Sequence, residues 1–114
     1  MEAKDKLLYW VLMYLIEPEI GLPLEKPINY VFSTHGGISG DPGWSVERTP
    51  VENGNFVYLV SVETEHSPVS FSEGKYDEVA FLKALRITLE IIADRFPERR
   101  REVLVVLNKY GLVD

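Results

Sequence analysis

The sequence predicts an α+β domain in which an N-terminal helix precedes a three- to four-stranded, mostly antiparallel sheet and two C-terminal helices pack on one face of that sheet. Two observations support this fold class. Apolar residues recur at helical spacing near both ends of the chain, and the segment between them holds short β-rich runs separated by turn residues. Strands that follow one another without intervening helices favour antiparallel pairing.

Length and composition predict one soluble domain over residues 1–114. A chain of 114 residues is close to the commonest domain size, and 46% hydrophobic with 26% charged residues is ordinary for a globular protein. Cysteine is absent, which excludes disulfides and thiolate chemistry and fits a reducing compartment, so we expect a cytoplasmic protein. Glutamine is absent as well, and the many Glu, Lys and Arg residues favour a thermophilic source.

The first element is expected to be a helix over the apolar run from Leu7 to Ile16, "LLYWVLMYLI". Ten residues are too few to cross a bilayer, which takes about twenty, so no membrane partner is expected. One stripe of this helix predicts a core face made by Leu8, Val11, Leu12 and Leu15. Because Trp10 and Tyr14 lie on the other side, we expect them to pack either in the core or against a second copy of the chain.

The middle of the chain is expected to hold the strands. Residues 28–33, "INYVFS", alternate in the strand period after a proline-rich connector. Residues 44–51 and 55–65 flank Asn53-Gly54, which predicts a hairpin with a tight two-residue turn. Pro50 donates no ladder hydrogen bond, so the first arm should be an edge strand or bulged there, whereas the second arm should lie inside the sheet. A short strand over residues 68–72, "PVSFS", would follow.

Two helices should close the chain. Asp77 is a plausible N-cap for a helix in which Leu82, Leu85, Leu89 and Ile92 form an apolar stripe. Pro97 then suits the first turn of a second helix. The buried residues expected for that helix are Val103, Leu104, Val106 and Leu107, and Gly111 should end it in a left-handed cap as part of a Schellman motif.

The charge of the chain argues against nucleic acid as a partner. Its net charge is −6, and the middle third, residues 41–78, has one Arg and one Lys against eight acidic residues. Binding to nucleic acid or to an anionic membrane depends on neutralising phosphate with basic side chains. Only one local cluster offers such a patch, and it consists of Arg95, Arg99, Arg100, Arg101 and Lys109. That cluster predicts a solvated, self-paired helix face, with a protein interface at Arg99 and Arg101 or a nucleic-acid contact as alternatives.

A glycine-rich loop, "STHGGISGDPGW", is the candidate ligand site, with His35, Gly36, Gly37 and Asp41 as its residues. No lysine follows the glycines as in a phosphate-binding P-loop, and the dinucleotide glycine pattern is missing. Turn chemistry accounts for Asp41 and the glycines, so a structural loop is the leading interpretation. His35 with Asp41 and a nearby His66 could alternatively hold a ligand or a metal ion in a small enzyme.

The sequence therefore favours a non-enzymatic protein-interaction module, homodimeric through Trp10, Tyr14, Arg99 and Arg101 or through an exposed sheet edge. No cofactor, metal or catalytic residue is predicted, and the expected partner is a second copy or another protein. The alternative function is a small ligand-binding protein or a metal-assisted enzyme that uses the loop of residues 33–44.

Overall fold

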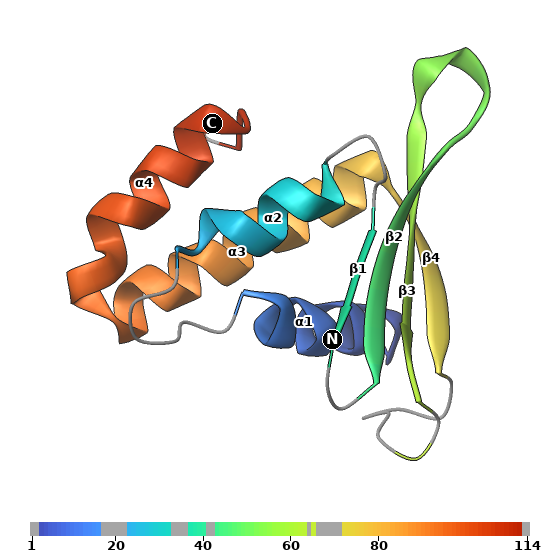
Figure 1. The fold of residues 1–114 in the computed structure, drawn as a ribbon, viewed down its shortest axis with the longest axis horizontal. Coiled ribbons are helices and arrows are strands. Elements are labelled where there is room, and N and C mark those ends of the chain that lie inside the picture. Colours follow the sequence, from blue (N-terminus) through green and yellow to red (C-terminus); the bar gives the residue numbers. More distant parts are fainter. Residues whose placement is uncertain are drawn as a thin grey trace.

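The computed structural model describes residues 3–16, 23–32, 37–40, 43–63, 65 and 72–112. It confirms the predicted α+β class: a four-stranded antiparallel sheet has an N-terminal helix and two C-terminal helices on one face (Figure 1). The helices are α1 (Ala3–Leu15), α2 (Glu25–Val31), α3 (Glu78–Arg95) and α4 (Arg100–Lys109). The strands are β1 (Gly37–Gly40), β2 (Trp44–Pro50), β3 (Phe56–Val62) and β4 (Glu73–Asp77).

The sheet is a simple meander in which β1, β2, β3 and β4 neighbour one another in chain order. Helices α1 and α3 contact its strands directly, while α4 packs on α3 and lies farthest from the sheet (Figure 1). The buried face of β3 is made by Tyr58, Val60 and Val62, which alternate with more exposed residues as the pleat requires. Tyr58 stacks on Phe81 of α3 with ring centroids 3.9 Å apart, so this pair joins the sheet to the helix layer.

The helix α1 buries the stripe that its sequence predicts. Its core side chains are Leu7, Leu8, Val11, Leu12 and Leu15. The other side of the helix holds Trp10 and Tyr14, which contact each other with ring centroids 4.5 Å apart. Tyr14 remains 38% exposed.

The strand predicted over residues 28–33 is wrong, because Ile28 to Val31 belong to helix α2. The buried residues here are Leu24, Ile28 and Val31, at the spacings of 4 and 3 that one face of a helix requires. Tyr30, which a strand period places on the same face as Ile28, is 51% exposed. Pro27 lies in the first turn of α2, where its missing N–H has no helical partner to lose.

The hairpin is confirmed, but its turn is longer than predicted. A short 3₁₀ helix, η1 (Glu52–Gly54), connects β2 to β3, and the N–H of Val51 donates to the carbonyl of Asn55 at 2.9 Å. Gly54 has the positive φ of 73° that its glycine allows. β3 lies inside the sheet, as predicted. The prediction of an edge strand is wrong for β2 as a whole, because β1 pairs with its first four residues. Pro50 lies beyond β1, where β2 pairs with β3 alone among the described residues, so its missing N–H costs no pairing there.

The fourth strand comes later than predicted. Residues 68–71 of the predicted strand lie outside the described residues, and β4 runs over Glu73–Asp77. Asp77 is the N-cap of α3, as predicted, and its carboxylate accepts a hydrogen bond from the N–H of Ala80 at 2.8 Å. A 3₁₀ turn, η3 (Pro97–Arg99), precedes α4.

The end of α4 forms the predicted Schellman motif. The N–H of Leu112 donates to the carbonyl of Leu107 at 2.8 Å, and the N–H of Gly111 donates to that of Asn108 at 3.3 Å. Both leucines are buried in the core, so the chain folds back where the sequence indicates.

Replacing Gly111 by alanine should lower the free energy of unfolding by roughly 1 kcal/mol, because its φ of 66° is strained for any residue with a Cβ. A new Cβ would meet nothing within 4 Å, so the backbone conformation alone carries the cost. Chemical denaturation of the purified variant measures this change in the free energy of unfolding. Gly37→Ala is the matched control, because that glycine lacks a positive φ and its Cβ would make ordinary contacts only. Equal stability of the two variants would contradict the assignment.

Candidate functional site

Half of the predicted ligand loop lies outside the described residues, which do not include His35, Gly36, Asp41 or His66. Gly37 begins β1 and pairs with Glu47 of β2. Within the described part of the chain, no three His, Asp or Glu side chains form a group that could hold a metal ion. The ligand and metal alternatives therefore stay predictions.

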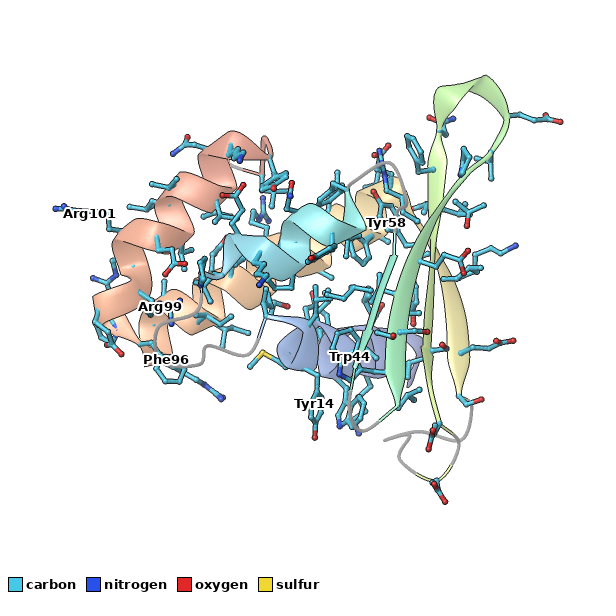
Figure 2. All side chains as sticks on the ribbon, in the orientation of Figure 1. Tyr14, Trp44, Tyr58, Phe96, Arg99 and Arg101 are labelled. Carbon is cyan, nitrogen blue, oxygen red and sulfur yellow. The ribbon has the colours of Figure 1, made fainter. Side chains whose placement is uncertain are left out.

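The predicted interface residues fall in two separate places. Trp10 and Tyr14 lie together on α1, whereas Arg99 and Arg101 flank the start of α4 (Figure 2). Arg99 turns inward, and its Nε donates to Glu102 Oε1 at 2.7 Å. Arg101 is exposed and points away from the molecule (Figure 2). Of the two arginines, Arg101 is therefore the better placed to contact a partner.

Helix α4 presents an apolar stripe to the surface. Val103, Val106 and Leu107 are buried against α3, which confirms three of the four residues predicted for its core face. The prediction is wrong for the fourth residue, because Leu104 is 51% exposed. Its neighbour Val105 is 59% exposed. At positions i, i+3, i+4 and i+7, one exposed face therefore holds Arg101, Leu104, Val105 and Asn108. We call these four residues the α4 stripe.

A hollow of about 250 Å³ lies between α3 and α4, beside the α4 stripe. Leu104 belongs to both. The apolar part of its lining comes from Ala93, Val103, Leu104 and Leu107, and the polar part from Glu90, Asp94 and Arg100. Apolar walls with charged residues at the rim are the chemistry that receives an apolar side chain of a bound protein.

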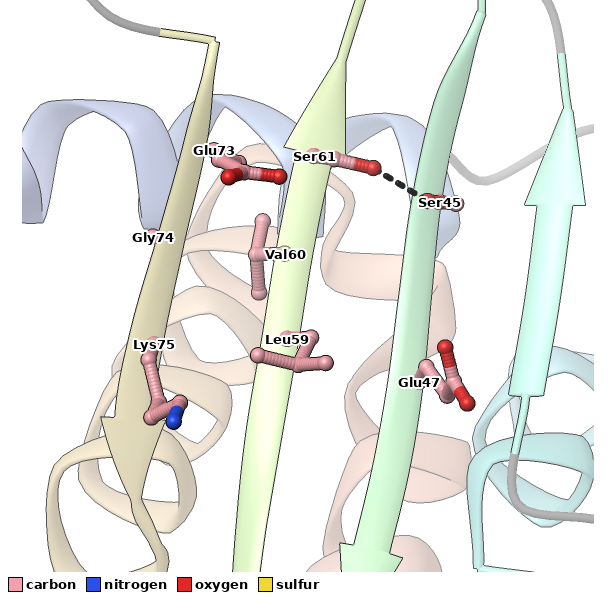
Figure 3. A pocket seen from close by; sticks show the side chains of 8 residues that line it. All are labelled: Ser45, Glu47, Leu59, Val60, Ser61, Glu73, Gly74 and Lys75. Carbon is pink, nitrogen blue, oxygen red and sulfur yellow. Dashed lines mark hydrogen bonds between the residues drawn. The ribbon is translucent and has the colours of Figure 1, made fainter.

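The sheet has a second hollow of about 390 Å³ on the face opposite the helices (Figure 3). Two rows of side chains cross β2, β3 and β4 on this face. In one row the hydroxyls of Ser45 and Ser61 are 2.5 Å apart. In the other, Leu59 pairs in register with Glu47 on one side and with Lys75 on the other. Leu59 is the one large apolar side chain of its lining that is exposed. An antiparallel sheet can leave such a face in water, so this hollow needs no ligand to explain it.

Arg48 forms a cation–π cluster at the hairpin end of the sheet. Its guanidinium carbon lies 3.4 Å from the ring centroid of Phe56 and 5.5 Å from that of Phe32, and Phe32 stacks on Tyr110 at 5.3 Å. Burial raises the pKa of the nearby Tyr58 hydroxyl, and the positive charge of Arg48 partly opposes that effect. The cluster joins α2 and the end of α4 to the sheet, which is a structural role.

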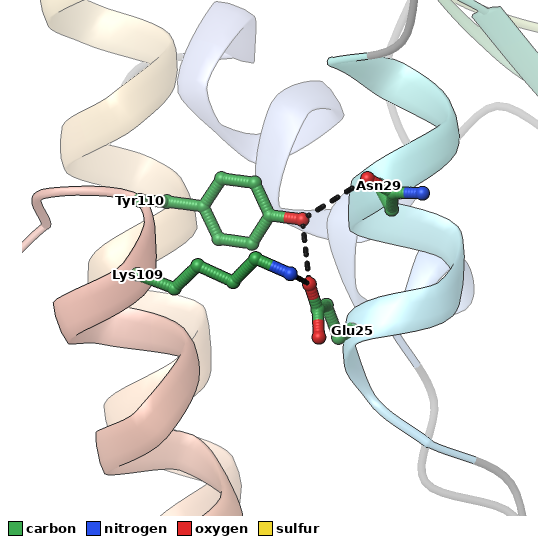
Figure 4. A network of polar contacts seen from close by, with 4 residues as sticks. All are labelled: Glu25, Asn29, Lys109 and Tyr110. Carbon is green, nitrogen blue, oxygen red and sulfur yellow. Dashed lines mark hydrogen bonds and ion pairs between the residues drawn. The ribbon is translucent and has the colours of Figure 1, made fainter.

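The C-terminus of α4 is held by a polar network with α2 (Figure 4). Lys109 pairs with Glu25, and the Tyr110 hydroxyl donates to Glu25 Oε2 at 3.0 Å. The hydrogen bonds from Lys109 and Tyr110 hold the pKa of Glu25 below its usual range. Burial, together with Glu25, raises the pKa of Tyr110 to about 12. The network fixes the position of α4, and with it the α4 stripe.

No helix among the described residues is both long enough and apolar enough to cross a membrane. Comparison with known proteins found no matching family model, no similar curated protein and no similar solved structure.

Proposed function

We propose that the chain is a non-enzymatic protein-interaction module that works as a homodimer and binds another protein through the α4 stripe. The observation that carries this proposal is the exposure of Leu104 and Val105, two adjacent aliphatic side chains on a helix whose opposite face is fully buried. Leaving such side chains in water forgoes the free energy of burying them, and contiguous exposed apolar surface is typical of interaction sites.

The chemistry of the α4 stripe favours a particular kind of partner. An aliphatic or aromatic side chain of the partner would enter the hollow between α3 and α4, which Leu104 borders. Arg101 at one end of the stripe would donate hydrogen bonds to a carboxylate of the partner, since its side chain is exposed. We therefore expect an amphipathic segment with apolar residues and at least one acidic residue.

The homodimer is supported by surfaces other than the α4 stripe. The exposed Tyr14 and its neighbour Trp10 on α1 keep the role predicted for them, and the sheet ends in a strand, β4, that pairs on one side only among the described residues. Both surfaces lie at a distance from the far side of α4 (Figure 1), so self-association leaves the α4 stripe open to a partner.

A photo-crosslinking amino acid at position 105 tests the partner-binding role. In cells of the source organism it should join the chain to a distinct protein, which mass spectrometry then identifies. The same amino acid at Val51 is the control, because Val51 is 45% exposed but lies at the hairpin tip. Identical crosslinking from the two positions, or none from position 105, would contradict the proposal.

A further inference from the structure

Among the described residues, no strand pairs with the outer edge of β4, and its backbone groups there follow a defined pattern. The N–H of Val62 donates to the carbonyl of Ser72, so these two residues form a hydrogen-bonded pair of the β3–β4 ladder. In antiparallel strands such pairs alternate with non-hydrogen-bonded pairs. From the register, Gly74 and Tyr76 therefore direct their backbone groups toward β3, while Glu73 and Lys75 direct theirs away from it.

The side chains beside those outward groups carry opposite charges. Glu73 and Lys75 are both exposed, and both lie on the sheet face opposite the helices, with Gly74 between them (Figure 3). Charged residues on a short edge strand discourage pairing with most other strands, because few of them bring matching charges. A strand with the complementary pattern is selected by the same charges.

We propose that the β4 edge binds a second copy of itself in antiparallel orientation about a two-fold axis at Gly74. This inference rests on the proposed homodimer and assigns the surface that forms it. In this register Glu73 lies opposite Lys75 of the second copy, and Lys75 lies opposite its Glu73. Both positions direct their N–H and carbonyl groups outward, so each pair also exchanges two backbone hydrogen bonds.

The residue on the axis fits this arrangement. Gly74 would face Gly74 of the second copy as a non-hydrogen-bonded pair, in which Cα atoms approach to about 4.5 Å. Gly74 itself brings no side chain to the axis, and the ring of Tyr76 in the same copy occupies the space beside it. The two sheets would join into one continuous eight-stranded sheet with all helices on one side.

One alternative register with the same hydrogen-bonding parity is centred on Lys75. It would place Lys75 opposite Lys75 and Glu73 opposite Asp77, so every charged cross-strand pair would bring like charges together. Opposite charges across a strand pair stabilise it and like charges destabilise it. A register centred on Tyr76 would also pair Lys75 with Asp77, but it would place the side chain of Tyr76 on the axis instead of Gly74. The charges together with the glycine therefore favour the register at Gly74.

The charge pattern gives a direct test by sedimentation over a range of protein concentrations at low salt. The wild-type chain should reach twice its 13.0 kDa mass, with an affinity of roughly micromolar order because a short strand pair buries little surface. Glu73→Lys and Lys75→Glu should each weaken the dimer by about tenfold, since two attractive pairs become repulsive. Lys75→Arg, which keeps the charge, should leave the affinity unchanged.

Mixing the two weakened variants supplies the decisive step. A chain with Glu73→Lys and a chain with Lys75→Glu restore both opposite-charge pairs, so the mixture should form a heterodimer with wild-type affinity. Both substitutions are at exposed positions, and the thermal unfolding of each variant checks that it folds.

Each other outcome is informative. A wild-type chain that stays monomeric overturns both this inference and the homodimer. A wild-type dimer that is insensitive to both substitutions, or a mixture without recovery, overturns the β4 contact and leaves the homodimer standing. A dimer that Glu73→Lys strengthens overturns the register at Gly74, because the register at Lys75 would then gain a Lys–Asp77 pair.

Discussion

Replacing Val105 by aspartate is expected to weaken binding of the proposed partner protein by about tenfold or more, while the chain keeps its fold. Aspartate at this position would remove the apolar contact that valine makes in the complex. It would also bury a carboxylate away from water, which is costly. A substitution of this kind removes a binding hot spot. Leu104→Asp should act in the same direction, because Leu104 also lines the hollow between α3 and α4. Isothermal titration with the crosslinked partner, once identified, measures both.

The fold should tolerate these changes because both side chains are mostly exposed. Surface substitutions usually change the free energy of unfolding by about 0.5 kcal/mol or less. Val51→Asp is the matched control: it introduces the same charge at an exposed valine of the hairpin tip, and it should leave partner binding unchanged. If Val51→Asp weakened binding as much as Val105→Asp, added negative charge rather than the α4 stripe would explain the loss.

The sequence predicts most of the fold because its strongest signals are local. The cap at Asp77, the proline before α4 and the glycine at position 111 each act within a few residues, and all three are found where the sequence places them. The positive φ at Gly54 is likewise local. Features of this kind depend little on the rest of the molecule.

The errors arise where contacts with the rest of the fold determine whether a segment forms a helix or a strand. The six residues from Ile28 to Ser33 fit a strand period, but the burial of Leu24 one turn earlier makes the same segment one face of a helix. The sequence does not predict β4, because Glu73, Gly74 and Lys75 have low strand propensity. Residues of this kind are tolerated in a strand at the edge of a sheet.

The sequence does not predict the exposure of the α4 stripe, for a related reason. Leu104 and Val105 are apolar, so a helix with several neighbours would bury them, and the sequence does not say how many neighbours α4 has. In the structure α4 packs mainly on α3, and only one side of it is covered. The sequence does carry one signal of an exposed face. Polar and apolar residues share one side of the helix, at the positions Arg101, Leu104, Val105 and Asn108.

Glu102 is one of the residues that connect α2 to α4, and its replacement by alanine should lower the free energy of unfolding by about 1–3 kcal/mol. Its Oε2 accepts a hydrogen bond from the N–H of Leu24 at 2.5 Å, and its Oε1 accepts from Arg99 Nε at 2.7 Å. Leu24 is buried at the start of α2, so alanine at position 102 would leave its N–H without that acceptor. Glu102→Gln keeps one acceptor oxygen and should cost less, about 1 kcal/mol.

The loss caused by Glu102→Ala should also depend on pH. Burial acts to raise the pKa of Glu102, but the hydrogen bonds from Arg99 and Leu24 and the charge of Arg99 outweigh it, so the pKa lies below its usual 4.5. A carboxyl group whose pKa is lowered by folding stabilises the folded chain above its unfolded-state pKa, and that contribution is lost as the pH falls through its folded-state pKa. The stability difference between the wild-type chain and Glu102→Ala should therefore be fully present at pH 7 and shrink below pH 4.5. Comparing the two chains by chemical denaturation at each pH cancels the acid sensitivity of Glu25, which both retain. A difference that stayed constant into acid would mean that Glu102 acts through packing and not through its charge.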